Sequence, residues 1–142
     1  IEEELGMLSA KLDEVAAMDV EPEQKIQALV FTHLREIRET VARNGSLRAE
    51  FFRNIWMVEK VRKRFDLEEH ETLRRVLQEG VDKGRFRIEH VGLMVDIIFY
   101  TIKGLEVPYI YNRLGDGLTE DEAYAHVRAI LGRMLNMPAA QA

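Results

Sequence analysis

Apolar residues recur every three or four positions along almost the whole chain, which is the period of a helix with one buried face. A first stripe runs from Leu5 to Val15, a wider one from Ile26 to Val41, and further stripes cover residues 51–134. No run of alternating β-branched residues is bounded by hairpin turns. The pattern therefore predicts an all-α chain.

Capping and breaking residues divide these stripes into helices. Pro22 suits the first turn of a helix, where its missing N–H costs nothing, and the Asn-Gly pair at 44–45 suits a helix end before a cap at Ser46. Two residue pairs have the spacing of a capping box: Asp66 with Glu69, and Thr119 with Glu122. We predict a six-helix bundle with short loops, with helices at about residues 5–18, 22–43, 46–65, 66–84, 88–112 and 119–137.

The predicted helix at residues 88–112 is apolar on nearly every side. Between residues 91 and 111 its only charges are Asp96, Lys103 and Glu106. A helix that is apolar all round must be buried all round. Either it is the centre of the core, or one side faces the core and the other faces a second copy of the protein.

The last predicted helix favours the second arrangement. Its small residues Ala125, Ala129 and Gly132 allow another helix to approach closely. Two neighbouring helices and their symmetry mates would then form an isologous four-helix interface, so we expect dimerisation through the last two long helices. The residues expected at this interface are Tyr100, Val107, Val127, Ile130, Leu131 and Met134.

Composition narrows the class of protein. The chain has 142 residues, the size of one domain, and no cysteine, which excludes disulfides, thiolate metal sites and a thiol nucleophile. A net charge of −5 argues against a body that wraps nucleic acid. The longest apolar stretch, Val91 to Ile102, contains Asp96 and is too short to span a membrane. Without a recognisable signal peptide, we expect a cytoplasmic protein that does not contact membranes.

The sequence carries no recognisable catalytic or metal-binding motif. None of the residues three positions before its four histidines is Glu, so the Glu-x-x-His pairs of di-metal bundles are absent. The zinc, nucleophile-elbow and phosphate-binding motifs are absent as well. We expect no catalytic residue, no metal site and no cofactor.

Two aromatic clusters, near Trp56 and near Tyr100, and His33 within an apolar stripe are the candidates for a binding site. Each has a plain alternative, which is core packing for the rings and a hydrogen-bonded core histidine for His33. The basic run at residues 53–64 is interpreted as a solvated helix face, because the acidic residues that follow from Asp66 cancel its field.

Four stretches, taken with the helix order, match a known pattern. They are Glu-Pro-Glu-Gln-Lys-Ile at 21–26, a Gly-x-x-x-Gly-x-Phe turn within 77–86, the apolar helix with Lys-Gly-Leu at 103–105, and the amphipathic helix at 123–135. Together they resemble the C-terminal ligand-binding and dimerisation domain of TetR/AcrR-type transcriptional repressors, over essentially the whole chain. The resemblance implies a connecting helix at 1–18 and the ligand-binding, dimerising domain at 19–142.

In that family a three-helix DNA-reading head precedes this body. No such head precedes Ile1, so we expect operator DNA to be bound only through a missing N-terminal head. The implied mechanism is a homodimeric switch, in which a small, largely apolar effector favours one arrangement and the connecting helix passes the change to the heads. Apolar residues would enclose the effector, and His33, Trp56 and Lys103 would hold its polar end. The expected cavity residues are Val30, His33, Leu34, Phe52, Ile55, Trp56, Leu73, Leu77, Phe99 and Lys103.

Two other functions stay open at this point. The chain could be a stand-alone helical adaptor that binds a partner helix in a groove, without a small-molecule cavity. It could also be a helical enzyme without a recognisable motif.

Overall fold

The computed structural model describes residues 2–43 and 55–136, with side chains at 3–43 and 60–135, and every regular element in these residues is an α-helix. The prediction of an all-α fold is confirmed for this part of the chain. None of these helices combines the length and the apolar character needed to cross a membrane. The helices are α1 (Glu2–Ala16), α2 (Pro22–Arg43), α4 (Ile55–Asp82), α5 (Val91–Ile110) and α6 (Glu120–Asn136).

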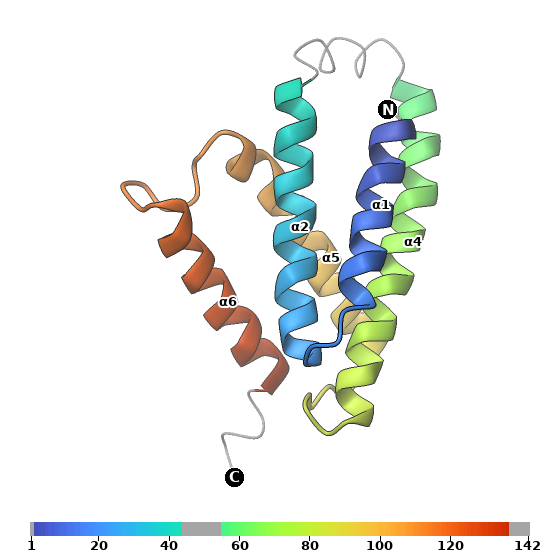
Figure 1. The fold of residues 1–142 in the computed structure, drawn as a ribbon, viewed down its shortest axis with the longest axis vertical. Coiled ribbons are helices and arrows are strands. Elements are labelled where there is room, and N and C mark those ends of the chain that lie inside the picture. The colour runs from blue at the N-terminus through green and yellow to red at the C-terminus, as the bar shows by residue number, and fades with distance from the viewer. Residues whose placement is uncertain (1, 44–54, 137–142) are drawn as a thin grey trace.

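Helix α2 holds the bundle together. It packs against α1, α4, α5 and α6, whereas α1 and α5 each pack against α2 and α4. Figure 1 shows α1, α2 and α4 side by side along the long axis, with α5 behind them and α6 leaning away to one side. Between these helices the chain buries Ile26, Leu77 and Ile102 completely. The core therefore lies where α2, α4 and α5 face one another.

Two predicted helix starts are confirmed. Pro22 is the first residue of α2, where its missing N–H leaves no helix bond unmade. At the start of α6, the backbone N–H of Glu122 donates to Thr119 Oγ1 at 3.2 Å, and the N–H of Thr119 donates to Glu122 Oε1 at 3.3 Å. This is the reciprocal capping box that the spacing predicts.

The helix start predicted at Asp66 is wrong. Helix α4 runs without a break from Ile55 to Asp82. The side chains of Asp66 and Glu69 contact Lys103 and His33 on other helices, so they do not cap the backbone of their own helix. The segments predicted as two helices at 46–65 and 66–84 thus form one helix from Ile55 onward, and the predicted cap Ser46 lies outside the described residues.

Helix α5 has two apolar faces on opposite sides, because an α-helix turns once every 3.6 residues. One face is buried against α2 and α4, with side chains at most 6% exposed at Val95, Ile98, Phe99, Ile102 and Tyr109. The other face is open, with side chains 41–66% exposed at Leu93, Ile97, Tyr100 and Val107 and at Tyr111, which directly follows the helix. Within a single chain, therefore, this helix is not the all-round buried centre of the core.

Candidate functional site

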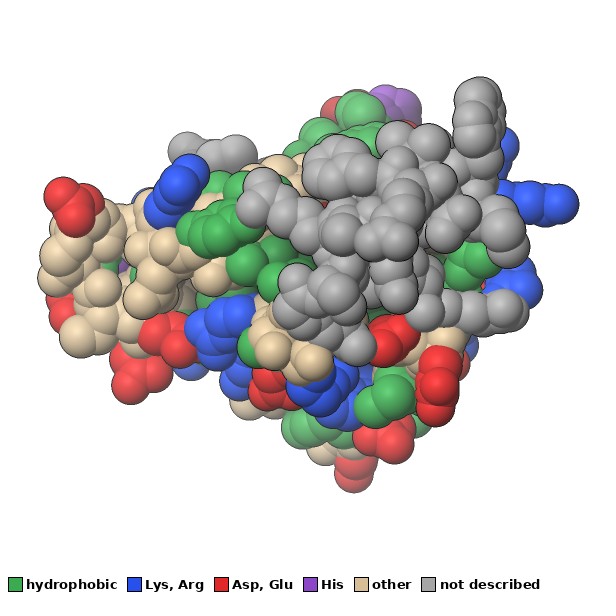
Figure 2. Space-filling model, turned by 90° about the horizontal axis from the view of Figure 1, so that it is seen from above, with side chains coloured by type: hydrophobic (Ala, Val, Ile, Leu, Met, Phe, Trp, Pro, Cys, Tyr) green, Lys and Arg blue, Asp and Glu red, His purple; other side chains and the backbone are tan. Residues whose placement is uncertain are grey.

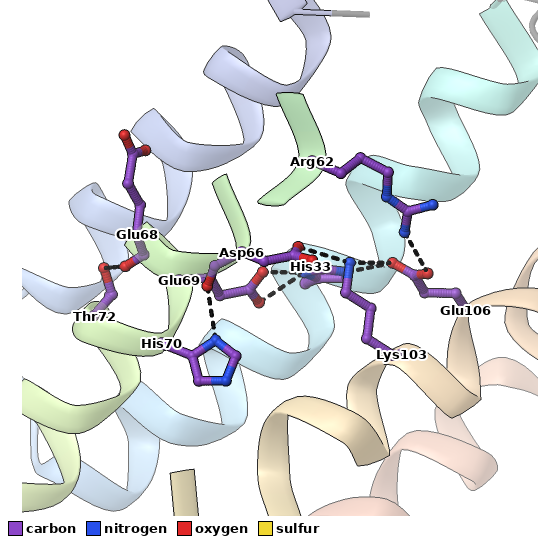
Figure 3. Close-up of polar contacts among 9 residues, drawn as sticks. All are labelled: His33, Arg62, Asp66, Glu68, Glu69, His70, Thr72, Lys103 and Glu106. Atoms are coloured by element: carbon purple, nitrogen blue, oxygen red, sulfur yellow. Dashed lines mark hydrogen bonds and ion pairs between the residues drawn. The ribbon is translucent and has the colours of Figure 1, made fainter. Parts of the chain in front are cut away.

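A buried histidine joins three helices. His33 lies on α2 with only 1% of its surface exposed. Its Nδ1 is 2.7 Å from Glu69 Oε2 on α4, and its Nε2 is 2.7 Å from Glu106 Oε2 on α5. Figure 3 shows the imidazole between the two carboxylates. An isolated buried charge is costly, so each member of this group depends on the others.

Two ionised carboxylates at the two ring nitrogens call for a protonated imidazole. A neutral ring has one N–H and one lone pair, so it can donate to only one carboxylate. Burial by itself lowers the pKa of His33, but the hydrogen bonds and charges of Glu106 and Glu69 outweigh burial and raise this pKa to about 9. His33 is therefore a buried cation at neutral pH.

Glu106 is the centre of a wider charged cluster. Besides His33, its carboxylate lies 3.6 Å from the Arg62 guanidinium and 3.8 Å from Lys103 Nζ. Burial tends to raise the pKa of Glu106, but the His33 hydrogen bond and the charges of Lys103, His33 and Arg62 hold it below its usual value. Lys103 also pairs with Asp66 at 3.0 Å. We call these residues the Glu106 cluster: His33, Arg62, Asp66, Glu69, Lys103 and Glu106.

Helical spacing brings these side chains together. Arg62, Asp66 and Glu69 follow one another at intervals of four and three on α4, so they lie along one face of that helix. Lys103 and Glu106 are three residues apart on α5 and share a face in the same way. The charged strip of α4 and the charged turn of α5 meet at His33 (Figure 3).

An aromatic group borders the cluster. The His70 ring packs on Phe99 with 4.1 Å between centroids, and its Nδ1–H donates to the Asp66 carbonyl at 2.8 Å. Lys103 Nζ lies 5.2 Å from the centre of the Phe99 ring. The cationic side of the cluster is therefore set against an apolar, aromatic wall.

The chemistry of the cluster concerns charge rather than metal binding. Among the described residues, no three His, Asp or Glu side chains are arranged to hold a metal ion. The two nitrogens of His33 point to different carboxylates, so Glu69 and Glu106 do not converge on one point. What the arrangement does is hold one nearly buried carboxylate, that of Glu106, among three cations.

Two of the expected cavity residues, His33 and Lys103, belong to the Glu106 cluster. His33 and Lys103 both contact Glu106, although no stripe or motif connects them in the sequence. Phe52 lies outside the described residues, as do the side chains of Ile55 and Trp56, whose backbone belongs to α4. The other expected residues are packed in the core with at most 3% exposed: Val30, Leu34, Leu73, Leu77 and Phe99.

The expected interface residues separate into two groups. Tyr100, Val107 and Ile130 are open to solvent, at 66%, 55% and 52% exposed. Val127 and Met134 are partly buried against the core. Leu131 is only 4% exposed and belongs to the core of the single chain.

The carboxylates and the arginine of the cluster escaped the sequence analysis. The spacing of Asp66 and Glu69 indicates a helix cap, and Arg62 belongs to a run interpreted as a solvated basic face. The structure exposes Lys60, Lys63 and Arg64 of that run but turns Arg62 toward Glu106. A usable signal did exist, because a histidine in an apolar stripe needs a partner and Glu106 is the only acidic residue in the second half of the apolar helix.

Acidic and basic side chains are interspersed on the end of the molecule seen in Figure 2, where side chains are described.

A second, smaller feature lies between α2, α5 and α6. Phe31 stacks on Tyr124 at 3.6 Å between centroids, beside a hollow of about 20 Å³ that Tyr109 also lines. That volume is about enough for one water molecule. It is too small for an organic ligand.

Comparison with known proteins gives no relative: no family model, no curated protein and no solved structure matches the chain. What the site does must therefore be inferred from its own residues.

Proposed function

We propose that this chain is the sensor and dimerisation body of a ligand-responsive transcriptional repressor of the TetR/AcrR type. The single observation that carries the proposal is the open apolar face of α5. Its exposed side chains follow one another at the spacing of a helix that packs against another helix. An apolar face of this length on a folded chain is typical of an interaction surface.

A second copy of the chain is the occupant that we propose for this face. Tyr100 and Val107 lie on it, and Ile130 is a large apolar residue of α6 that is exposed to solvent. A two-fold axis through this surface would use the same patch on both copies, so that each contact of one residue with another is repeated in reverse, as an isologous interface requires. The repressor-type arrangement of the helices and the homodimer through the last two helices are parts of this proposal.

The effector site is proposed at the Glu106 cluster. Support comes from the meeting of His33 and Lys103, the two described residues expected to hold the polar end of an effector, at one carboxylate. The Phe99 ring, whose centre lies 5.2 Å from Lys103 Nζ, suits a largely apolar effector body. A small-molecule site of this kind combines an apolar lining with a few polar groups that set orientation.

Helix α1 is placed to transmit a change at the cluster. Lys11 pairs with Glu36 on α2, and Ser9 donates to Glu68 on α4 at 2.8 Å. Movement of α2 relative to α4 would therefore shift α1 as well. In the proposed repressor, operator DNA binds only to an N-terminal head that α1 follows, and the protein acts in the cytoplasm.

An adaptor without a small-molecule site is the second candidate function. The same open face of α5 would then receive a helix of a different protein. The close packing of Val30, Leu34, Leu73 and Leu77 favours this candidate, because each of these side chains is at most 2% exposed in the core.

Sedimentation velocity and native mass spectrometry of the purified chain test the proposal. At micromolar concentration we expect a dimer, and we expect small organic compounds to raise the temperature of thermal unfolding. A monomer at tens of micromolar overturns the repressor-body proposal. A dimer that no compound from a broad panel stabilises favours the adaptor.

A further inference from the structure

We propose that the Glu106 cluster is a carboxylate-binding site which the protein's own Glu106 occupies, and that an organic monocarboxylate with an apolar body binds by displacing it. This inference rests on the proposed sensor function, which it deepens by naming the class of effector. Its support comes from the contacts, the burial, the charge balance and the backbone of α5.

The contacts show a site already built for an anion. Three cationic groups surround one carboxylate: His33 at 2.7 Å, Arg62 at 3.6 Å and Lys103 at 3.8 Å. A guanidinium, an ammonium and an imidazolium are the groups that proteins use to bind carboxylates, through charge-assisted hydrogen bonds. Glu106 now fills the position that an effector carboxylate would take, so no separate empty cavity is needed for the anion.

The side chains of the cluster become more exposed with each step outward from His33. This gradient gives an anion a route from solvent to the buried imidazole. The exposed fraction of the side chain is 1% for His33, 12% for Glu106, 20% for Lys103 and 35% for Arg62. An anion that approaches from solvent therefore meets Arg62 and Lys103 before it reaches the buried imidazole. The two accessible groups on this route attract anions over the distances at which charges act in water.

The charge balance selects a monoanion. With His33 protonated, the cluster holds three positive groups and three negative ones. When Glu106 leaves, Glu69 and Asp66 remain with the three cations, so one positive charge is uncompensated. One carboxylate restores neutrality, whereas a cationic ligand would add a second unpaired charge at a partly buried place.

The backbone of α5 allows Glu106 to move. Pro108 has no N–H, so the helix bond that residue 108 would donate to the Gly104 carbonyl is missing. Gly104 is exposed, and a Cβ there would contact nothing within 4 Å. The turn that carries Glu106 is therefore held less firmly than the rest of α5.

Displacement of Glu106 would reach the open face of α5. The next residue, Val107, is 55% exposed on that face, where we propose the second copy. A rotation of this turn moves the inner carboxylate of Glu106 and the outer side chain of Val107 together. Effector binding and subunit arrangement are thereby coupled through one turn of helix.

Three probes with the same apolar body test the proposal: 2-naphthoate, 2-naphthylmethanol and 2-naphthylmethylammonium. Calorimetric titration of the purified chain near pH 7 should give a dissociation constant about tenfold lower for the carboxylate than for the alcohol, and no binding of the ammonium. In a carboxyl ¹³C-labelled 2-naphthoate, the bound carboxyl should stay ionised to a lower pH than the free acid.

Variants separate displacement of Glu106 from simple apolar binding. Glu106→Gln removes the internal competitor and should bind 2-naphthoate about tenfold more tightly, whereas Lys103→Met should bind it about tenfold more weakly and leave the alcohol unchanged. Glu79→Gln is the matched control, because Glu79 is an ion-paired α4 carboxylate whose partners, Lys25 and Lys83, lie outside the cluster. It should leave all three constants unchanged.

Several outcomes overturn the inference. They are equal binding of carboxylate and alcohol, no binding of 2-naphthoate by either the wild type or Glu106→Gln, or weaker binding by Glu106→Gln. If Glu106→Gln does not fold, Lys103→Met and Arg62→Met decide, since both should weaken carboxylate binding selectively. The proposed function is tested separately. A monomer in sedimentation overturns the repressor-body proposal whatever the probes show. A dimer that binds none of the probes as expected overturns only the carboxylate-site inference.

Discussion

His33 Nε2 on α2 lies 2.7 Å from a carboxylate oxygen of Glu106 on α5, and the other ring nitrogen lies at the same distance from Glu69 on α4. One buried cation thus joins the three helices that enclose the core. A buried ion pair adds little net stability compared with apolar packing of equal volume. Removing only one of its partners is costly, because the other charge is then buried without compensation. The first two predictions follow from this asymmetry.

Replacing His33 should strongly destabilise the chain. His33→Leu leaves Glu69 and Glu106 facing each other in the core without the cation between them. We expect the free energy of unfolding near pH 7 to fall by about 3–5 kcal/mol, measured by urea denaturation. His126→Leu, at an exposed position of α6, should change it by about 0.5 kcal/mol or less. A loss of under about 1 kcal/mol for His33→Leu would contradict an imidazolium at this position.

Stability should fall at alkaline pH. The pKa of His33 is about 9 in the folded chain against an ordinary value of 6.5, so the folded state holds a proton that the unfolded state has lost. This contribution is fully present below pH 6.5 and is lost as the pH rises through about 9. Urea denaturation from about pH 6 to pH 10 should show the decline, and ¹⁵N NMR should find both ring nitrogens protonated near pH 7.5.

The same pH series on His33→Leu is the control for this prediction. Without the imidazole, the decline between about pH 6.5 and pH 9 should be much smaller. Equal stability of the wild-type chain at both ends of the series would show that His33 is neutral in the fold.

A charge on the open face of α5 should separate the proposed dimer. In Tyr100→Glu, two carboxylates would be brought into an apolar interface, and we expect the dimer dissociation constant to rise by about 100-fold or more in sedimentation velocity. Leu67→Glu changes an equally exposed apolar residue, 63% against 66%, on α4, and should leave the dimer intact. If both variants dissociate equally, or neither does, the interface lies elsewhere.

Gly80 and Gly6 should respond in opposite ways to alanine. A Cβ on Gly80 would overlap the ring of Phe86, which packs directly on this glycine, so Gly80→Ala should lower the unfolding free energy by about 1–3 kcal/mol. Gly6 lies inside α1, and a Cβ there would meet nothing within 4 Å, so Gly6→Ala should raise it by about 0.5–1 kcal/mol. Thermal and urea unfolding of the two variants measure the difference, and a stable Gly80→Ala would mean that Phe86 can move aside.

The cap of α6 gives a smaller, local effect. Thr119→Ala removes the hydroxyl that accepts from the N–H of Glu122 and should cost about 1 kcal/mol, with faster amide exchange in the first turn of α6. Thr101→Ala is the control, since the Thr101 hydroxyl donates to the Ile97 carbonyl within α5 and caps nothing. Unchanged exchange in Thr119→Ala would show that Glu120 alone, through Tyr109 and Arg38, secures the helix start.

A local sequence signal, such as a helix cap, predicts the structure correctly when the residues that form it have no stronger partner on another helix. Pro22 starts α2, and Thr119 with Glu122 caps α6, because each effect concerns backbone groups within one helical turn. Asp66 and Glu69 have the same spacing but do not cap a helix. Their carboxylates gain more from the buried cations on α2 and α5 than from the backbone of an uninterrupted α4.

For the site, residue types were easier to predict than partners. An apolar stripe with a histidine, and an apolar helix with three charges, both indicate buried polar groups in need of partners. The apolar stripe selected His33, and the resemblance to repressor bodies added Lys103; the two residues meet at Glu106. The same reasoning missed Arg62 and assigned Leu131 to the dimer face, although Leu131 faces the core.

The periodicity, together with the capping and breaking residues, was enough to establish the helices, most of their approximate limits and the apolar character of α5, because these properties depend on neighbours a few residues away. The pairing of His33 with Glu69 and Glu106 spans 36 and 73 residues. It depends on how far each helix is rotated and shifted against the next, which no local period encodes. For the same reason, only the packing of the helices decided which side of α5 enters the core and which side stays open to solvent.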